Sequence, residues 1–431
     1  MVGNSEPRGF GALVFSSVFG AVLEWYDFIL YGVLSALVFN KLFFPHQDPR
    51  VGTLLAFTTF AIGFLARPIG GYILGGLGDR IGRKPVLIIT MIIIGASTGL
   101  MGCMPTYASV GIWAAIFLVV LRLIQGFALG GEFGGAVILV AETSEAHRRG
   151  WWASWPQAGG PAGVLLAVGT LSILGAFTTH QQFLAWGWRI PFFVSIVIAC
   201  WGLWMRHGVE ESTIFQEAVQ KARVTVQEPA WKVLLSPGAL LRAWGVRLLE
   251  NTAFYLFGIF VVAYATSSSV GFSQSVALHV TTLGAAFQLA FILIGGRLSD
   301  VLGRKRVMVF ASFGLIIWAP IFFFFVDSHS IALFCLAVVV GLSFHGLLAG
   351  PEAAWLIELF PTRHRYIGSS LAFQGSSIFA GGPAPLIASA LLIVTGHTWP
   401  IVCYIVCCGV IALIALALSK ETFNIDLRKN V

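Results

Sequence analysis

Long apolar runs, separated by short polar or glycine- and proline-marked breaks, dominate the chain. A helix needs about 20 apolar residues to cross a bilayer, and each run supplies about that many or more. The pattern predicts twelve spans, at 10–39, 50–77, 85–104, 107–141, 151–176, 187–206, 240–267, 276–297, 306–326, 330–356, 366–394 and 399–419. Several are longer than a bilayer is thick, so we expect tilted or broken helices. The predicted fold class is an all-α membrane protein with twelve transmembrane helices.

A loop motif occurs twice, at matching places in the pattern. GGLGDRIGRK at 75–84 and GGRLSDVLGRK at 295–305 each join the second and third spans of a set of six. A second pair repeats at nearly the same offset. AETSEAHRRG at 141–150 and IELFPTRHRYIG at 357–368 each place an acidic residue at the end of a span and basic residues in the next loop. Two independent pairs of repeated strings at nearly the same offset indicate that the chain arose by duplication.

The longest polar segment lies between the sixth and seventh spans, at residues 207–239. We interpret it as a linker between an N-terminal six-helix bundle at 1–206 and a C-terminal six-helix bundle at 240–431. Two parallel halves of this kind are related by an axis along the membrane normal. We therefore expect a substrate site near the midplane, between two pseudo-symmetric bundles.

The composition excludes a soluble protein, because 57% of the residues are hydrophobic and 10% are charged, against about 25% charged in an average soluble domain. Basic residues fall almost all on one side of the predicted membrane. They are Arg8, Arg80, Arg83, Lys84, Arg148, Arg149, Arg304, Lys305, Arg306, Arg363, Arg365 and those of 206–242. This bias predicts that both termini are cytoplasmic. It also accounts for the net charge of +7, so we expect no nucleic-acid partner.

The sequence carries none of the common catalytic or metal-binding motifs. It has no HExxH, no nucleophile elbow and no phosphate-binding Gly/Lys loop, and its six cysteines show no metal-ligand spacing. The first apolar run continues past signal-peptide length, so we expect it to be retained as a helix. We expect neither an enzyme nor a bound metal.

The repeated loop reads GxxxDxxGR(R/K) and resembles the signature loop of the major facilitator superfamily. The matching residues are Gly75, Asp79, Gly82, Arg83 and Lys84 in the first copy, and Gly296, Asp300, Gly303, Arg304 and Lys305 in the second. Glycines permit a tight turn, and the charges can pair across the seam between the halves. The resemblance implies the major facilitator fold and a cytoplasmic latch, broken and remade during transport. Glu142 and Glu358 are further latch candidates, and charges that only set topology are the alternative.

Ionisable residues inside apolar spans are costly, so each is a functional candidate. Span one carries Glu24 and Asp27 on one helix face, in EWYDFILYG, and span four carries Arg122 in RLIQGFALGGEFGGA. With FLAWGWRIPFF at 183–193 and ELFPTRHR at 358–365, these strings resemble the metabolite:proton symporter family over essentially the whole chain. Members of that family carry shikimate, dicarboxylates, citrate, proline and betaine.

The same resemblance implies how protons are coupled. In that family and in the related sugar:proton symporters, YDxxxxG in span one and RxxxG in span four carry the coupling acid and its basic partner. Here Tyr26, Asp27 and Arg122 match them. Forming or breaking an Asp27–Arg122 pair as the halves rock would switch the proton affinity of the carboxyl group. Glu24 is an alternative coupling acid, and a permanent structural ion pair is the alternative to coupling.

Spans five and eleven carry matching interruptions, WPQAGGPAG at 155–163 and FQGSSIFAGGPAP at 373–385. Breaks at corresponding positions of the two halves point to a binding site or to flexing helices. Gln157 and Gln374 are therefore candidates for contacts to substrate hydroxyl or carbonyl groups.

Aromatic and basic residues complete the candidate substrate site. The candidates for apolar walls are Trp25, Tyr26, Trp155 and Tyr255. Arg67 interrupts span two, where it either faces the cavity and favours an anionic substrate or pairs with Glu132 or Glu24. Arg247 and Glu250 lie three residues apart in span seven, where they can pair with one another.

We therefore expect a proton-coupled symporter that imports a small organic acid, shikimate-like or another carboxylate, by alternating access. Its partners would be the substrate, protons and the lipid bilayer of the bacterial inner membrane. The proton gradient would supply the energy without a cofactor, and a monomer suffices for a pathway. A proline- or betaine-type symporter, and an uncoupled facilitator or exporter, are the alternatives.

Overall fold

The computed structural model describes residues 10–46, 49–207, 237–267, 270–423 and 425–427, and every regular element in these ranges is helical. The predicted linker at 207–239 lies almost wholly outside the described residues, so its conformation is not part of the fold given below.

The N-terminal half contains six long helices. In chain order its elements are α1 (Phe10–Leu34), η1 (Ser35–Phe39), α2 (Asn40–Leu42), α3 (Pro49–Ile81), α4 (Arg83–Cys103), α5 (Tyr107–Val110), α6 (Trp113–Thr143), η2 (Ala146–Arg148), α7 (Arg149–Phe177), α8 (His180–Ala185), η3 (Gly187–Arg189) and α9 (Ile190–His207). The long members α1, α3, α4, α6, α7 and α9 correspond to the six predicted spans of this half.

The C-terminal half repeats the plan, with two of its spans interrupted. Its elements are α11 (Pro237–Phe254), η5 (Tyr255–Phe260), α12 (Val261–Ala265), α13 (Gln274–Leu302), α14 (Arg304–Val326), α15 (Ile331–Glu358), η6 (Thr362–His364), α16 (Arg365–Ala380), α17 (Pro383–Thr395) and α18 (Trp399–Ala417). The π-helical η5 joins α11 to α12, and α16 with α17 forms the eleventh span.

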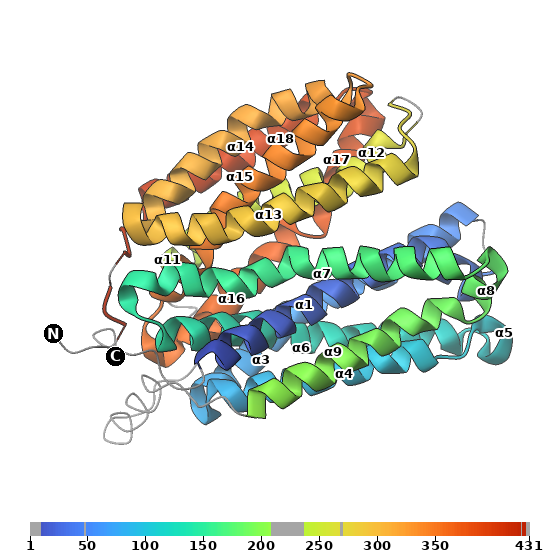
Figure 1. Cartoon of the computed structure of the whole chain (residues 1–431), viewed down its shortest axis with the longest axis horizontal. Helices are drawn as coiled ribbons and strands as arrows, with labels where there is room; N and C mark the ends of the chain where they lie inside the picture. Colours follow the sequence, from blue (N-terminus) through green and yellow to red (C-terminus); the bar gives the residue numbers. More distant parts are fainter. Residues whose placement is uncertain (1–9, 47–48, 208–236, 268–269, 424, 428–431) are drawn as a thin grey trace.

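The two halves lie side by side as helical bundles (Figure 1). Eleven described helices or helix pairs are long and apolar enough to cross a membrane. Large apolar side chains face outward on both bundles, with Phe177 85% and Ile393 83% exposed. A lipid environment accommodates these side chains, whereas water would not. The predicted all-α fold with two six-helix bundles is confirmed.

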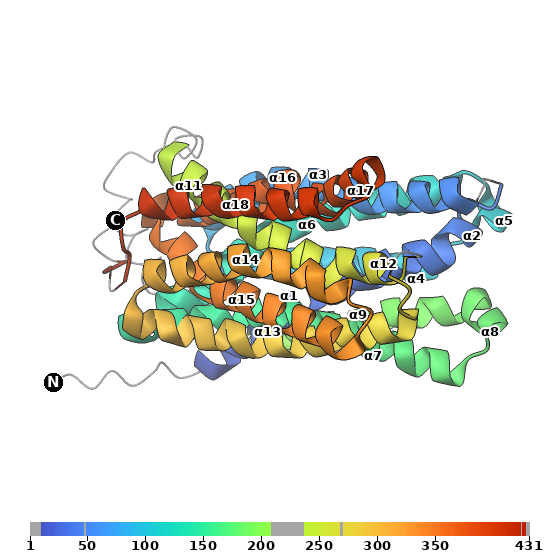
Figure 2. The same ribbon diagram turned by 90° about the horizontal axis from the view of Figure 1, so that it is seen from above.

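Two helix pairs form the seam between the halves. Helix α7 packs along α13, and α16 packs along α3, so each half contributes one member of each pair (Figures 1 and 2). The backbones approach closely at motif glycines. A Cβ on Gly296 would lie 2.6 Å from the carbonyl oxygen of Gly150, and one on Gly75 would lie 2.9 Å from Cα of Ile367. The glycines of the repeated loop therefore permit contact between the halves.

The second and third spans of each half are joined by a tight turn at the same end of the molecule, which we call the motif end; the opposite end is the far end. The turn residues Gly82 and Gly303 have φ of 110° and 98°, a conformation that favours glycine. The ends of α6 and α15 and the starts of α7 and α16 lie at the motif end too, on the left of Figure 1.

The interruptions predicted in spans five and eleven differ in the structure. Helix α7 runs without a break through Pro156 and Pro161, whereas the eleventh span divides at Gly381 and Gly382. In α7 the neighbouring glycines pack against α1, which holds the helix together across its prolines. In the eleventh span two consecutive glycines precede Pro383, which begins the new helix at its first turn, where the missing N–H costs little.

Candidate functional site

A narrow central cavity lies between the halves and is lined by both. Its walls are Trp25, Arg67, Gln157, Gly160, Pro161, Arg247, Glu250, Asn251, Phe254, Tyr255, Gln288, Ile292, His345, Phe373 and Ser377. The cavity volume is about 30 Å³, room for about two water molecules at ~10–15 Å³ each. Two arginines, one carboxylate, amides and aromatic rings thus share one narrow space, which must widen before an organic molecule can enter.

Arg67 belongs both to the cavity wall and to an ion pair. Its Nη1 lies 3.6 Å from Oε1 of Glu24, and its guanidinium lies over the ring of Phe64 at 4.6 Å. Arg67 therefore both faces the cavity and pairs with Glu24, while its preference for an anionic substrate stays a prediction. Glu132, the other possible partner, accepts a hydrogen bond from Thr90.

Arg247 enters the cavity from the C-terminal half and contacts two buried carboxylates. Its Nη2 is 3.3 Å from Oε2 of Glu250, and its Nη1 is 3.1 Å from Oε2 of Glu352. Nε donates to Oγ of Ser376 at 3.1 Å, and the guanidinium lies 3.6 Å from the centre of the Phe373 ring. The expected Arg247–Glu250 pair is present, but it forms part of a larger cluster.

Two further residues extend this cluster, and sequence reasoning did not assign them to the site. His345 Nε2 lies 3.2 Å from Oε1 of Glu250, and its Nδ1 lies 2.8 Å from Nε2 of Gln288. Both line the cavity. A histidine or a glutamine on an apolar helix is at most a general candidate from the sequence, and its approach to Glu250 or to His345 in space is what assigns it to this cluster.

Asp27 lies inside the N-terminal bundle, apart from the cavity wall. Thr98 donates to its Oδ2 at 2.6 Å, and Ser195 donates to its Oδ1. Gln125 connects it to Arg122, since Gln125 Nε2 donates to Asp27 at 3.2 Å and Gln125 Oε1 accepts from Arg122 at 2.5 Å. The predicted coupling acid and arginine are thus linked through an amide. Gln125 was not singled out, although it stands three residues after Arg122 on the same helix face.

The remaining substrate candidates divide between the cavity and other places. Gln157 and Tyr255 line the cavity. The hydroxyl of Tyr26 instead donates to the carbonyl oxygen of Pro191 at 3.0 Å, within the N-terminal bundle. Trp155 packs against Trp151, with ring centroids 5.7 Å apart. Gln374 donates to the carbonyl oxygen of Leu129 at 3.1 Å, across the seam. The structure therefore does not bring Tyr26, Trp155 or Gln374 to the cavity wall.

Aromatic side chains from both halves meet on the far-end side of the cavity. The rings of Trp25 and Phe254 are 4.9 Å apart, and those of Phe28 and Tyr255 are 6.3 Å apart. Phe64 packs into the same cluster. These contacts join α1 and α3 to the end of α11 and to η5, and so narrow the cavity on this side.

At the motif end, each Asp of the repeated loop caps a helix of the other half. Asp79 accepts from the backbone N–H groups of Tyr366 and Ile367, at 3.3 and 3.1 Å, where α16 begins. Asp300 accepts from those of Gly150 and Trp151, both at 2.8 Å, where α7 begins. Carboxylates at helix N-termini satisfy otherwise unpaired N–H groups and favour the positive end of the helix dipole.

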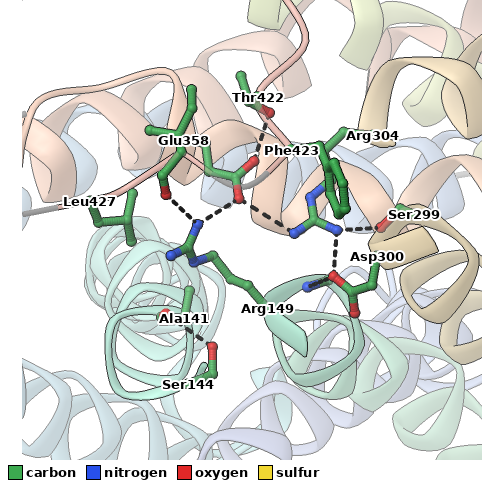
Figure 3. Close-up of polar contacts among 12 residues, drawn as sticks. Ala141, Ser144, Arg149, Ser299, Asp300, Arg304, Glu358, Thr422, Phe423 and Leu427 are labelled. Carbon is green, nitrogen blue, oxygen red and sulfur yellow. Dashed lines mark hydrogen bonds and ion pairs between the residues drawn. The ribbon is translucent and has the colours of Figure 1, made fainter. Parts of the chain in front are cut away.

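Each latch also has a glutamate that receives one arginine from each half. In the first copy, Glu142 lies 3.6 Å from Arg83 of its own half and 2.7 Å from Arg365 of the other. In the second copy, Glu358 Oε1 lies 3.4 Å from Arg304 and 3.0 Å from Arg149 (Figure 3). The predicted latch residues Asp79, Arg83, Glu142, Asp300, Arg304 and Glu358 are thus brought together in two symmetric networks.

Two lysines follow the motif arginines and differ in their contacts. Lys84 is half-buried in the first turn of α4. Lys305 donates to the carbonyl oxygens of Ala417 and Ser419, at 3.2 and 3.0 Å, and so holds the end of α18. Arg149 and Arg365, which the sequence marked only as topology signals, prove to be the cross-seam partners. Both occupy matching positions in the second pair of repeated strings, at 141–150 and 357–368, and this match was the signal that could have identified them as partners.

Two six-helix bundles that enclose a charged cavity at their interface define a membrane transport protein. The family model for "Sugar (and other) transporter" matches residues 13–234, and that for "Major Facilitator Superfamily" matches residues 243–424. The chain belongs to the major facilitator superfamily, and it is a multi-pass membrane transporter of small molecules rather than an enzyme.

Its relatives include several metabolite transporters. The shikimate transporter of Escherichia coli K12 is 37% identical over 94% of this chain and 93% of its own. The proline/betaine transporter of Salmonella typhimurium is 34% identical over 95% of this chain and 83% of its own. Among solved structures, the proton:xylose symporter XylE bound to 6-bromo-6-deoxy-D-glucose has a TM-score of 0.80 at 18% identity, covering 99% of both chains. The last similarity concerns the fold alone.

Proposed function

We propose that this transporter is a proton-coupled symporter that imports a small organic acid, of shikimate type or another carboxylate, across the bacterial inner membrane. We place the motif end and both termini in the cytoplasm and expect a monomer to be sufficient. The observation that carries the proposal is the pair of arginines, Arg67 and Arg247, that line one cavity from opposite halves. The 37% identical shikimate transporter supports the same substrate class.

An organic anion between these arginines would contact both halves at once. Guanidinium groups bind carboxylates through two parallel hydrogen bonds. Gln157 and Asn251, from opposite walls, add neutral groups that can bond to substrate hydroxyls. Because both halves would hold the anion, binding would favour the arrangement in which the bundles close around it, as alternating access requires.

Proton coupling is assigned to Glu24, Asp27 and Arg122. Glu24 shares Arg67 with an incoming anion, and protonation of Glu24 would release that arginine for the substrate. Asp27 lies deeper, in contact with Thr98, Ser195 and Gln125. A change in the Gln125 bridge as the helices move would alter how strongly Asp27 is stabilised in its ionised form.

The first experiment is proton uptake into proteoliposomes that contain the purified transporter and an internal pH dye. Shikimate, a dicarboxylate, citrate, proline and betaine are added in turn, and protein-free liposomes are the control. Internal acidification on addition of an acid supports coupled symport and identifies the substrate. Substrate entry without acidification would identify an uncoupled facilitator. If no compound of the panel enters or acidifies vesicles that contain folded protein, export would be favoured.

Asp27→Asn and Glu24→Gln distinguish the two coupling acids in the same vesicles. The substitution at the coupling acid should abolish accumulation against a gradient, a loss of at least tenfold, while radiolabelled substrate still exchanges. Accumulation that survives both changes would remove both acids from the coupling role.

A zwitterionic substrate is the second candidate, favoured by the proline/betaine relative. Glu250 and the rings of Trp25 and Phe254 give the cavity groups that could hold a quaternary ammonium beside a carboxylate. Acidification with betaine or proline, and none with the acids of the panel, would establish this reading in place of the first.

A further inference from the structure

The C-terminal wall of the cavity carries more buried negative than positive charge. Among the described residues, Arg247 is the one guanidinium of this wall, and it faces the carboxylates of Glu250 and Glu352 at 3.3 and 3.1 Å. All three side chains are buried. With His345 neutral, the ionised cluster has a net charge of −1. Charge that is not balanced in a water-poor site is expensive, so a further anion can enter beside this cluster only if a proton is taken up with it.

The N-terminal wall does not supply the missing positive charge. From that side, Arg67 is the charged residue that lines the cavity among the described residues. Its charge is balanced by Glu24, which lies 3.6 Å away. The other groups around Glu250 and His345 are uncharged. From α11, η5, α13, α16 and α7 they are Asn251, Phe254, Tyr255, Gln288, Phe373, Ser377 and Gln157. The excess negative charge therefore stays with the C-terminal cluster.

The two carboxylates on Arg247 are not equivalent. Glu250 lines the cavity, whereas Glu352 is not among the lining residues. Ser376 and Phe373 fix the guanidinium from the side, and Glu352 holds its Nη1. Nη2, which faces Glu250, is the donor that a substrate arriving in the cavity can reach.

Glu250 has a second partner that can keep it in place after it leaves Arg247. Its Oε1 lies 3.2 Å from Nε2 of His345, and Gln288 holds the other ring nitrogen at 2.8 Å. A proton added to this pair can reside on the imidazole or on the carboxyl group, and either arrangement makes the pair neutral overall. Gln288 can serve as donor or acceptor to the ring, so both forms are accommodated.

We propose that Glu250 and His345 form a second proton site of the transporter, in which a substrate carboxylate replaces Glu250 on Nη2 of Arg247 while the Glu250–His345 pair takes up one proton. Charge balances in this step. Before binding, Arg247, Glu352 and Glu250 sum to −1. Afterwards Arg247, Glu352 and the substrate sum to −1, and the protonated pair contributes zero. The site couples one proton to one carboxylate beside the substrate itself, and it rests on the proposed symport of organic acids.

The test is the number of protons carried per substrate, measured from the proton gradient that just balances a shikimate gradient in proteoliposomes. His345→Gln and Glu250→Gln each keep a hydrogen-bonding side chain but remove the titrating group. We expect the ratio to fall by about one proton in each variant. His279→Gln is the matched control, because His279 lies on α13 and bonds to Ser275 of its own helix.

Direct binding gives a second readout that does not need turnover. Shikimate added to the purified transporter in weakly buffered detergent should take up protons from solution, seen with a pH indicator. His345→Gln and Glu250→Gln should take up about one proton fewer per bound molecule. Methyl shikimate, which lacks the carboxylate, should cause no uptake at this site in the wild-type protein.

The outcomes separate this site from the function on which it rests. If no acid of the panel moves protons through the wild-type protein, the proposed function fails. If the wild type is coupled and both variants keep the wild-type ratio and the wild-type proton uptake on binding, the second site is refuted and the symport proposal stands.

Discussion

The two copies of the latch make the same contacts from opposite halves, but at different distances. The glutamate pair across the seam is shorter in the first copy, at 2.7 Å for Glu142–Arg365 against 3.0 Å for Glu358–Arg149, whereas the aspartate contacts are shorter in the second. Asp300 accepts two backbone hydrogen bonds at 2.8 Å, whereas Asp79 accepts its two at 3.1 and 3.3 Å. Arg304 lies 2.6 Å from Asp300, and Arg83 lies 3.7 Å from Asp79. The two copies therefore have the same partners, but the distances between those partners differ.

The segment after α18 accounts for much of this difference. Glu421 accepts from the backbone N–H groups of Arg304 and Lys305, at 2.9 and 3.1 Å, where α14 begins. Thr422 donates to Oε2 of Glu358 at 2.6 Å (Figure 3). Arg149 donates to the carbonyl oxygen of Ile425 at 3.1 Å. The chain end also reaches the first latch, where the carbonyl oxygen of Leu427 accepts from Arg365 at 3.5 Å. Its contacts with the second latch are more numerous and shorter, so we expect that latch to be the last to open.

The largest effect should follow removal of the shared carboxylate in the second copy. Glu358→Gln leaves Arg149 and Arg304 buried without their common counter-charge, at a cost of about 3–5 kcal/mol for a broken buried pair. Spin labels at Ala146 and Leu302, with the native cysteines replaced, would report the distance between the halves at the motif end. We expect Glu358→Gln to move most molecules to the separated arrangement.

Glu142→Gln is the matched change in the first copy. The comparison predicts a smaller shift, because the second latch remains intact with its added contacts from the chain end. Equal shifts for the two variants would contradict the ranking of the two copies.

Neutralising the capping aspartates should have an intermediate effect. A hydrogen bond to a charged group contributes about 1.5–3 kcal/mol, so Asp300→Asn should slow turnover by about tenfold or more. Asp79→Asn, whose hydrogen bonds are longer, should slow it about threefold. Initial rates of substrate exchange, together with the dissociation constant, would test this. A change in affinity with normal turnover would show that these residues do not act as a latch.

Thr422→Val isolates the contribution of the chain end. The change removes one hydrogen bond to the Glu358 carboxylate, so we expect a loss of about 1.5 kcal/mol in the closed arrangement, the lower end for a hydrogen bond to a charged group. This corresponds to a shift of about tenfold in the spin-label distance populations. In a Glu358→Gln background the same change should have almost no effect, because its partner is gone. An undiminished effect in that background would mean that Thr422 acts elsewhere.

The repeats of the sequence made the fold and the latch predictable. Each residue type of the repeated motif has a physical role. Gly82 and Gly303 adopt positive φ, and Gly75 and Gly296 contact a backbone across the seam. The aspartates accept hydrogen bonds at helix N-termini. All of these residues lie within a string of about ten residues that occurs twice in the chain. A periodic apolar pattern and a repeated string therefore sufficed.

The cavity was less predictable, because its chemistry depends on which helix faces meet in space. Asp27 and Arg122 matched a family pattern, but the bridging Gln125 follows from the packing of α4, α6 and α9 around the carboxylate. Nor could spacing show that His345 reaches Glu250, 95 residues away in the chain. Polar residues on apolar helices are recognised as candidates from the sequence, while their partners are set by tertiary contacts.

The two glutamines of the matched interruptions offer the finest test of the pseudo-symmetry. Gln157 stands on the unbroken α7 and lines the cavity, whereas Gln374 stands on α16 and bonds across the seam to Leu129. Gln157→Ala should weaken substrate affinity about threefold to tenfold, the value of one neutral hydrogen bond of about 1 kcal/mol. Gln374→Ala should leave the affinity within twofold and change only the exchange rate. Binding and exchange measured on both variants decide the matter: an affinity loss at Gln374 that equals the loss at Gln157 would mean that the eleventh span reaches the substrate in another conformation, and that its break at Gly381 lets it do so.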